Sequence, residues 1–286
     1  MKFFFVNLIF KLPYGYYFLI KKISFIFRTF RDYPFSLKSF TYFTVRADLS
    51  NSAFAPLLKF NCYTHQLSED LIAISFLKKG DQVIDIGANI GFNSAIYSDL
   101  VGETGKVFSF EPSVINFKFI HELSIKYKQI IPLQLAAGDI NAMLNFSDEH
   151  YSDRSHINEN KISKRNYLVK CVRLDDWQHT IKNFHPKFLK IDTEGYDLKV
   201  LTGSSNVIKT FQPIICFECF DQKNLNLIKN FINEKSLYSF FRIRSQYPTS
   251  VFNKEDWTNN YYAIPLNNIK LIPSFIFERN FLTKIE

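Results

Sequence analysis

The sequence predicts an α/β fold built on a mostly parallel, Rossmann-like sheet of seven strands. An apolar segment at residues 82–86 runs into a glycine turn and then a helical segment, as in the first unit of a nucleotide-cofactor fold. Short apolar segments then alternate with longer helical ones down the chain, which is the order of a parallel sheet. Residues 238–242 and 261–264 are expected to close the sheet as a hairpin whose last strand is antiparallel.

The chain is long enough for one large domain with an appendage, at 286 residues. We expect a basic, Phe-rich N-terminal extension with helical and aromatic character at residues 1–66, a main domain at 67–268 and a C-terminal tail at 269–286. Residues 1–60 contain nine Lys or Arg and two Asp, so most of the net charge of +8 lies there. A basic, aromatic terminus predicts contact with an anionic membrane surface, whereas nucleic acid would require a basic domain.

Neither apolar stretch of the N-terminus, 3–10 or 12–20, reaches the ~20 residues of a membrane span. A secretory signal is also a poor fit, because no small-residue cleavage site follows. Residues 18–30 interleave Phe with Lys and Arg, as in an interfacial helix, although these aromatics would equally suit packing on the main domain. We therefore predict a cytoplasmic protein with peripheral membrane contact. A short strand near 40–45 and a helix at 67–77 should precede the core.

Four cysteines stand at positions 62, 171, 216 and 219. The last two have the spacing of a metal knuckle or a redox pair. They fall in a predicted strand, however, where positions three apart face opposite sides. We therefore favour buried, reduced thiols.

The turn after the first core strand departs from the dinucleotide fingerprint. It reads Asp-x-Gly-x-Asn-x-Gly from Asp85 through Gly87 and Asn89 to Gly91, without the third glycine of Gly-x-Gly-x-x-Gly. A pyrophosphate needs several amides at a helix start. A ligand without phosphate does not, and S-adenosylmethionine is such a ligand. We expect Asp85 to bind its ammonium group and the turn backbone to approach the ligand closely.

Glu111 ends the second predicted strand, one strand–helix–strand unit after Asp85. An acidic residue at this place accepts hydrogen bonds from ribose hydroxyls. The alternative is a helix cap, and the spacing to the glycine turn favours the ribose role. Residues 137–139 lie where an adenine would pack.

Residues later in the chain are candidates for the catalytic groups. Asp192 ends the strand at 188–191, so it should reach the same sheet edge as Asp85 and Glu111. Glu194 follows two residues later, where the alternative is an acid that complements a helix dipole. His156 lies in a polar segment, 150–166, which is either an acceptor-binding loop or a solvated connector.

Five ordered stretches together resemble the FkbM-type family of S-adenosylmethionine-dependent methyltransferases, over roughly residues 60–265. These stretches are Val83-Ile84-Asp85-Ile86-Gly87-Ala88-Asn89-Ile90-Gly91, Phe110-Glu111-Pro112, Ala136-Ala137-Gly138-Asp139, Arg173-Leu174-Asp175-Asp176, and Leu189-Lys190-Ile191-Asp192-Thr193-Glu194-Gly195 with Val200-Leu201-Thr202-Gly203. One departure is Tyr63-Thr64, where members often have Tyr-Glu.

The resemblance implies a class I methyltransferase sheet, S-adenosylmethionine as cofactor, and O-methylation of a hydroxyl on a sugar, glycan or related metabolite. The residues expected to bind the cofactor are Asp85, Gly87, Ala88, Asn89, Gly91, Glu111, Pro112, Ala137 and Asp192. Because the cofactor supplies an activated methyl group, the protein must align the acceptor and take its proton.

Asp192 is the first candidate for the base, followed by Glu194 and His156, and Lys190 would orient an acceptor oxygen or pair with a carboxylate. We predict no metal site, although these acids are of a kind that binds divalent ions. The expected partner is a hydroxyl-bearing small molecule or glycan, with no nucleic acid. The competing hypotheses are a nicotinamide-dependent oxidoreductase and a non-catalytic binding module apposed to a membrane.

Overall fold

The computed structural model describes residues 33–38, 42–47, 72–147, 156–157, 166–244, 257–278 and 282–285. The predicted interfacial helix at 18–30 lies outside these residues. In the N-terminal part, β1 (Tyr33–Lys38) and β2 (Tyr42–Ala47) pair as an antiparallel hairpin, which overlaps the strand predicted at 40–45. Of the helix predicted at 67–77, residues 72–76 are described and helical. None of the described helices has the length and apolar character needed to cross a bilayer.

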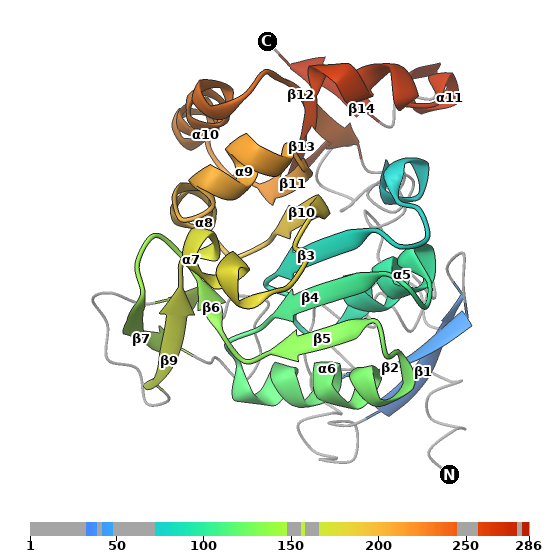
Figure 1. Ribbon diagram of the computed structural model, residues 1–286, viewed down its shortest axis with the longest axis vertical. Helices are drawn as coiled ribbons and strands as arrows, with labels where there is room; N and C mark the ends of the chain where they lie inside the picture. Colours follow the sequence, from blue (N-terminus) through green and yellow to red (C-terminus); the bar gives the residue numbers. More distant parts are fainter. Residues whose placement is uncertain are drawn as a thin grey trace, which may run out of the picture.

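The core of the molecule is an eight-stranded sheet in the order β14-β12-β13-β11-β10-β3-β4-β5 (Figure 1). The strands from β11 to β5 run parallel, and β13 is antiparallel to its neighbours. The strands are β3 (Gln82–Ile86), β4 (Lys106–Phe110), β5 (Ile130–Leu133), β10 (Pro186–Ile191), β11 (Ile214–Glu218), β12 (Tyr238–Arg244), β13 (Trp257–Pro265) and β14 (Leu282–Ile285). This is the predicted Rossmann-like class I methyltransferase order, with the β12–β13 hairpin next to β11.

The sheet has one strand more than predicted. The C-terminal run, expected to be a tail, continues through η4 (Leu266–Leu271) and α11 (Ser274–Glu278) into β14, which pairs antiparallel with β12. Ile276 and Leu282 are buried in the main core, and this apolar burial holds the segment against the sheet. The described residues of this run therefore pair with the main sheet and pack against its core.

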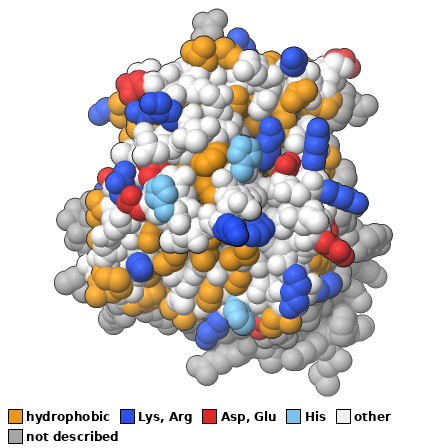
Figure 2. Space-filling view, viewed as in Figure 1, with side chains coloured by type: hydrophobic (Ala, Val, Ile, Leu, Met, Phe, Trp, Pro, Cys, Tyr) orange, Lys and Arg blue, Asp and Glu red, His pale blue; other side chains and the backbone are white. Residues whose placement is uncertain are grey.

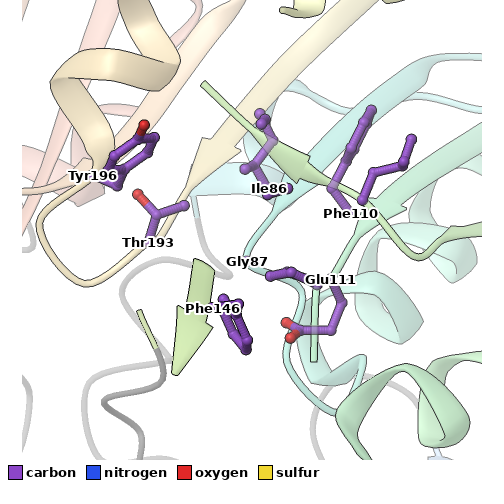
Figure 3. Close-up of a pocket in the computed structure, with 11 residues that line it drawn as sticks. Ile86, Gly87, Phe110, Glu111, Phe146, Thr193 and Tyr196 are labelled. Atoms are coloured by element: carbon purple, nitrogen blue, oxygen red, sulfur yellow. The ribbon is translucent and has the colours of Figure 1, made fainter. Parts of the chain in front are cut away.

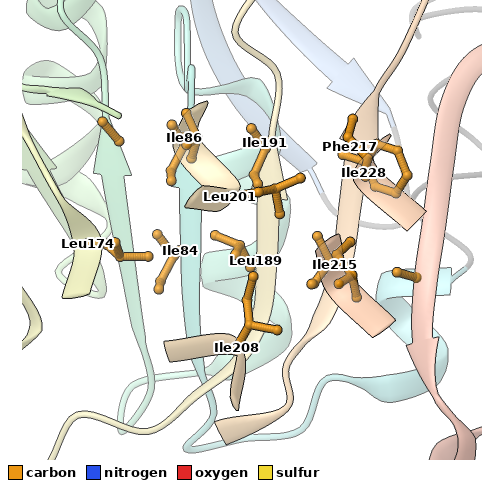
Figure 4. Close-up of a cluster of buried hydrophobic side chains, with 14 of the residues drawn as sticks. Ile84, Ile86, Leu174, Leu189, Ile191, Leu201, Ile208, Ile215, Phe217 and Ile228 are labelled. Atoms are coloured by element: carbon orange, nitrogen blue, oxygen red, sulfur yellow. The ribbon is translucent and has the colours of Figure 1, made fainter. Parts of the chain in front are cut away.

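Helices cover both faces of the sheet, because the strand side chains alternate between two apolar cores. Val83 faces the cluster that includes helix α5 (Phe92–Val101), and its neighbour Ile84 faces the opposite cluster. Figure 4 shows the second cluster, in which strand residues such as Leu189 and Ile215 meet side chains from the covering helices. These helices are α7 (Leu174–Trp177), α8 (Asp197–Thr202), α9 (Ser205–Phe211) and α10 (Gln222–Lys235).

The cysteines follow the same alternation. Cys216 belongs to the first core cluster and Cys219 to the second, so the two thiols lie on opposite faces. They and Cys171 are buried, and none of the three is part of a disulfide among the described residues. This geometry agrees with the prediction of separate buried thiols and gives no metal knuckle.

A smaller four-stranded sheet, in the order β6-β9-β7-β8, stands beside the carboxyl ends of β4 and β5 (Figure 1). Its strands are β6 (Ala136–Ala137), β7 (Ala142–Ser147), β8 (His156–Ile157) and β9 (Asn166–Val172). The two strands predicted around the polar segment are β7 and β9. This sheet brings residues of the middle of the chain to the edge where the predicted site lies.

Candidate active site

The turn between β3 and α5 is held in a left-handed conformation by three residues. The φ angles of Gly87, Asn89 and Gly91 are 76°, 53° and 83°. A Cβ on Gly87 would lie 1.8 Å from the backbone oxygen of Asp192. The glycine is therefore required for the close backbone packing of these two turns. The prediction that this turn approaches a ligand closely stays a prediction. A Cβ on Gly91 would lie 2.6 Å from Leu123 of helix α6 (Val114–Lys126).

Glu111 fastens this turn to the end of β4. Its Oε2 accepts a hydrogen bond from the backbone N–H of Asn89, and its Oε1 accepts one from that of Ser113, both at 2.8 Å. Ser113, not Glu111, is the N-cap of α6, since its hydroxyl accepts from Asn116 N. The alternative role expected for Glu111, that of a helix cap, is therefore taken by Ser113. The Glu111 side chain instead lines a pocket.

The pocket lies at the carboxyl ends of β3 and β4. In the view of Figure 3, Thr193 and Tyr196 stand on one side and Glu111 on the other, with Gly87 between them. The lining residues are Ile86, Gly87, Phe110, Glu111, Pro112, Leu135, Ala136, Ala137, Phe146, Thr193 and Tyr196. This edge is where the chain reverses its direction of strand addition, from β3–β4–β5 to β10–β11, the usual place for ligands in such sheets.

The predicted cofactor residues divide into two groups. Four of them, Gly87, Glu111, Pro112 and Ala137, line the pocket. The others do not: Ala88 packs into a small apolar cluster with α6, and Asp85 is fully buried. The Oδ1 atom of Asn89 is buried without a hydrogen-bond partner at the turn.

Next to the pocket is an acidic cluster. Asp192, Glu194 and Glu218 each place a carboxylate oxygen within 4.8 Å of the other two. Lys190, whose side chain is 3% exposed, places Nζ 2.7 Å from Oδ2 of Asp192, whose side chain is 42% exposed. The structure thus joins the predicted residues Asp192, Glu194 and Lys190, and it adds Glu218 from the end of β11.

Burial sets the protonation of this cluster. It raises the pKa of Glu218 to about 9, an effect that the charges of Asp192, Glu194 and Asp197 increase and that of Lys190 reduces. Burial also raises the pKa of Asp197 to about 6, although this carboxylate accepts hydrogen bonds from the hydroxyl of Thr193 at 2.7 Å and from Glu218 N at 3.1 Å. At neutral pH, Glu218 therefore holds a proton.

Three carboxylates at this spacing could in principle bridge a divalent ion. Lys190 already neutralises Asp192, however, and the buried environment favours the protonated form of Glu218. We assign no metal ion to the cluster, and the absence of a metal site stays a prediction.

His156 lies in β8, where its backbone pairs with Ser147 of β7. Its side chain is outside the described part of the structure, so its catalytic role stays a prediction.

Phe146, Thr193 and Tyr196 line the pocket but were not predicted as site residues. Thr193 lies within the Asp192–Gly195 turn and Tyr196 follows it, so their position next to predicted site residues was the signal that could have found them. Phe146 comes from β7, and only the position of the small sheet brings it to the pocket.

Comparison with known proteins places this geometry in a family. A family model of the methyltransferase FkbM domain matches residues 85–245. A curated relative, the hexuronic acid methyltransferase AglP of Haloferax volcanii, is 25% identical over 140 residues, which are 48% of this chain and 56% of the relative. The match thus spans little more than half of the relative's length.

Two solved structures are similar at lower identity. An FkbM methyltransferase of Methylobacillus flagellatus is 17% identical over 74% of this chain and 54% of its own, with a TM-score of 0.48. A protein described as a putative rRNA methylase of Clostridium thermocellum is 13% identical over 71% of this chain and 97% of its own, with a TM-score of 0.44. Because the family model covers more than half of the sequence, the chain belongs to the family of methyltransferases with an FkbM domain.

Proposed function

We propose that this protein transfers the methyl group of S-adenosylmethionine to a hydroxyl group of a sugar or glycan. The observation that supports this proposal most directly is that a pocket and a partly exposed carboxylate lie at the same edge of the sheet. The pocket lies at the chain reversal, and the Asp192 carboxylate lies at the neighbouring strand end, beside Thr193 of the pocket wall. A donor in the pocket would thus have a proton acceptor close to its reactive end.

The pocket residues fit the methyl donor. Apolar groups from Phe110, Pro112 and Ala137 suit an adenine ring, and the Glu111 carboxylate at the end of β4 suits ribose hydroxyls. The unpaired Oδ1 of Asn89 is a further acceptor at the turn. When bound, the cofactor would supply an activated methyl group on a good leaving group.

The chain's own residues would handle the acceptor and its proton. Asp192 is the group best placed to take the hydroxyl proton as the oxygen accepts the methyl group, because its side chain is partly exposed while its partner Lys190 is buried. The ion pair fixes the orientation of the Asp192 carboxylate. Glu194 stands next to it as the second candidate. The main contribution of the site would be alignment in a compact pocket.

The family and its curated relative support a sugar as the acceptor class. The Haloferax volcanii relative is named for a hexuronic acid, so a sugar hydroxyl is the acceptor that this comparison favours. Since the match is partial, the sugar and the position methylated are open to experiment.

Two experiments test the proposal. S-adenosylhomocysteine should raise the melting temperature of the protein and NAD should not, because only the first fits a turn without the third glycine. Labelled methyl groups from S-adenosylmethionine should then appear in fractionated cell-envelope glycans. A rise in the melting temperature with NAD alone would contradict S-adenosylmethionine as the cofactor. Transfer into a fraction free of sugars would overturn the acceptor class.

A further inference from the structure

The carboxylate of Asp197 joins two elements at the edge of the sheet where the pocket lies. Asp197 is the first residue of α8 and is 2% exposed. Its Oδ2 accepts hydrogen bonds from the hydroxyl of Thr193 at 2.7 Å and from the backbone N–H of Thr193 at 3.3 Å. Its Oδ1 accepts one from the backbone N–H of Glu218 at 3.1 Å. The carboxylate therefore connects the turn after β10 to the end of β11, through three donors that all lie outside α8.

The turn that Asp197 holds has a strained backbone. The φ angles of Glu194 and Gly195 are 54° and 96°, and a non-glycine residue keeps such a conformation only where its surroundings hold it in place. Thr193 of this turn lines the pocket, and in Figure 3 its hydroxyl oxygen is turned away from Gly87. Because that hydroxyl donates to Asp197, the carboxylate fixes a pocket residue from behind.

The donors around Asp197 suit the ionised carboxylate. Three hydrogens point at its two oxygens, and protonation would add a fourth. Burial raises the pKa of Asp197 to about 6, while the hydrogen bond from the Thr193 hydroxyl lowers it. The carboxylate is therefore mostly ionised at neutral pH. Below about pH 6 its protonated form accepts less well, and it holds the turn less firmly.

We propose that Asp197 is a positioning residue for the methyl donor: its carboxylate holds the turn of Asp192 and Thr193 against the end of β11, and so keeps this wall of the pocket in its binding geometry. This inference rests on the proposed function. Asp197 is not among the residues that line the pocket, so it acts on the donor through Thr193. An acid that served only to stabilise the fold would change the free energy of unfolding and leave the ligand affinity of the folded protein unchanged.

The first test is Asp197→Asn, which keeps the shape of the side chain but replaces one accepting oxygen by an amide that can only donate. Titration calorimetry on the full chain at about pH 7.5 should show S-adenosylhomocysteine binding about tenfold more weakly, the effect of losing a hydrogen bond to a charged group. A structural effect alone would leave this affinity unchanged.

Asp175→Asn is the matched control. Asp175 is 3% exposed, and its carboxylate accepts from the backbone N–H groups of Asn206 and Val207, away from the residues that line the pocket. The same substitution there should lower the melting temperature and keep the affinity for S-adenosylhomocysteine within about twofold. Melting curves of each variant establish that it is folded.

A pair of substitutions at Thr193 tests the same contact from the other side. Thr193→Val keeps the shape and loses the hydroxyl that donates to Asp197, whereas Thr193→Ser keeps the hydroxyl and loses the methyl group. Valine should weaken S-adenosylhomocysteine by about fivefold, and serine should stay within about twofold of the unmodified protein. The reverse order would overturn the inference, because Thr193 would then act by its own contact with the ligand. If Asp197→Asn does not fold, this pair decides.

The pH dependence of binding is a further readout. The ionisable groups that act on Asp197 are Asp192 of the turn and, at the end of β11, Glu218 and Cys219. The pKa of Glu218 is about 9, and burial raises that of Cys219 above its usual range, so neither changes charge between about pH 5 and about pH 7.5. Over this range acidification should weaken S-adenosylhomocysteine binding to the unmodified protein by about fivefold. Asp197→Asn should lose this dependence, and Asp192→Asn should keep it.

Three results would overturn the inference and leave the proposed function standing. They are unchanged affinity in folded Asp197→Asn, equal weakening in Asp175→Asn, and a pH dependence that Asp197→Asn keeps. Failure of the unmodified protein to bind S-adenosylhomocysteine would instead overturn the proposed function itself.

Discussion

Among the described residues, Glu218 is the carboxyl group whose pKa the fold raises most. Its carboxyl has an ordinary pKa of 4.5 and one of about 9 in the folded protein, because burial and three neighbouring acids oppose its charge. Between these values the unfolded chain releases a proton that the folded chain keeps. The contribution of Glu218 to the free energy of unfolding is therefore fully present below about pH 4.5, and it is lost as the pH rises toward 9.

We predict that Glu218→Gln, which mimics the protonated acid, removes this decline. At pH 8 the variant should be more stable than the unmodified protein by about 1–3 kcal/mol, after allowance for partial burial and shared protons. Denaturant unfolding between pH 6.5 and 9 measures it, a window above the pKa of about 6 of Asp197. Glu103→Gln, at an exposed glutamate, is the control. Parallel pH dependences in the two variants would contradict the assignment.

Asp192 is predicted to be the general base of methyl transfer. Asp192→Asn keeps the shape of the side chain but cannot accept a proton, so methyl transfer should fall by about 10²–10⁴-fold. S-adenosylhomocysteine affinity should stay within about threefold, because the change removes proton transfer and little binding. Asp99→Asn, at an exposed acid of α5, is the matched control and should retain full activity. Retained turnover in Asp192→Asn would shift the role to Glu194 or His156.

Pocket residues were predictable where the residue type is itself unusual. A glycine turn and a strand-terminal glutamate stand out in a sequence, and both Gly87 and Glu111 line the pocket. Thr193 and Phe146 do not stand out, because their types are common and their role depends on where the small sheet lies. Glu218 lay on the predicted edge, but the burial that raises its pKa is visible only in the folded structure.

Among the structural elements, the β3–α5 turn and the turn after β10 depend on each other. Gly87 and Gly195 both have positive φ, at 76° and 96°, but their surroundings differ. A Cβ at Gly87 would collide with backbone atoms of Asp192, whereas one at Gly195 meets nothing within 4 Å. Substituting Gly195 therefore measures the cost of backbone strain alone, whereas substituting Gly87 adds the cost of a steric clash.

We predict that Gly195→Ala costs about 1 kcal/mol of unfolding free energy and Gly87→Ala at least about 3 kcal/mol. Only the second should also lower S-adenosylhomocysteine affinity, because the turn must move away from Asp192. Denaturant unfolding and calorimetry measure the two effects. Equal costs at both sites would show that the two turns do not pack as described.

Elements were predictable from the sequence where apolar runs are bounded by glycine, proline or acids, as in β3 and β10. The strand β14 was missed because its segment is short, with basic and aromatic neighbours, and only its pairing with β12 makes it a strand. Asp175 shows the same limit. Acids at a helix start suggest caps for that helix, but Asp175 accepts from the amides of Asn206 and Val207 and so caps α9.

At the scale of the whole molecule, the sheet gathers residues from distant parts of the chain at one edge. Asp85 and Lys190 are register partners on neighbouring strands, as are Lys190 and Cys216, so the ends of β3, β10 and β11 meet there. The space-filling view in Figure 2 shows Lys and Arg scattered over the visible face among apolar and acidic side chains. The concentration of basic charge is instead a property of the N-terminal sequence.

This separation of charge gives the last prediction, which concerns membrane contact through residues 1–31. These residues hold six Lys or Arg with many Phe, and each basic residue near an anionic surface contributes about 1 kcal/mol. We therefore expect the full chain to sediment with vesicles that contain phosphatidylserine, and not with neutral ones. Replacing Lys21, Lys22 and Arg28 by Gln should release it.

The same loss of charge at three exposed lysines of the main domain, Lys118, Lys126 and Lys128, is the control and should leave sedimentation unchanged. Raised salt should weaken binding, because screening shortens the reach of the surface potential. If the unmodified chain sediments with neither kind of vesicle, the prediction of membrane contact fails and the alternative, packing of the aromatic N-terminus on the main domain, is favoured. The active site would then meet its acceptor in solution, and a lipid-linked glycan would lose its advantage over a free sugar.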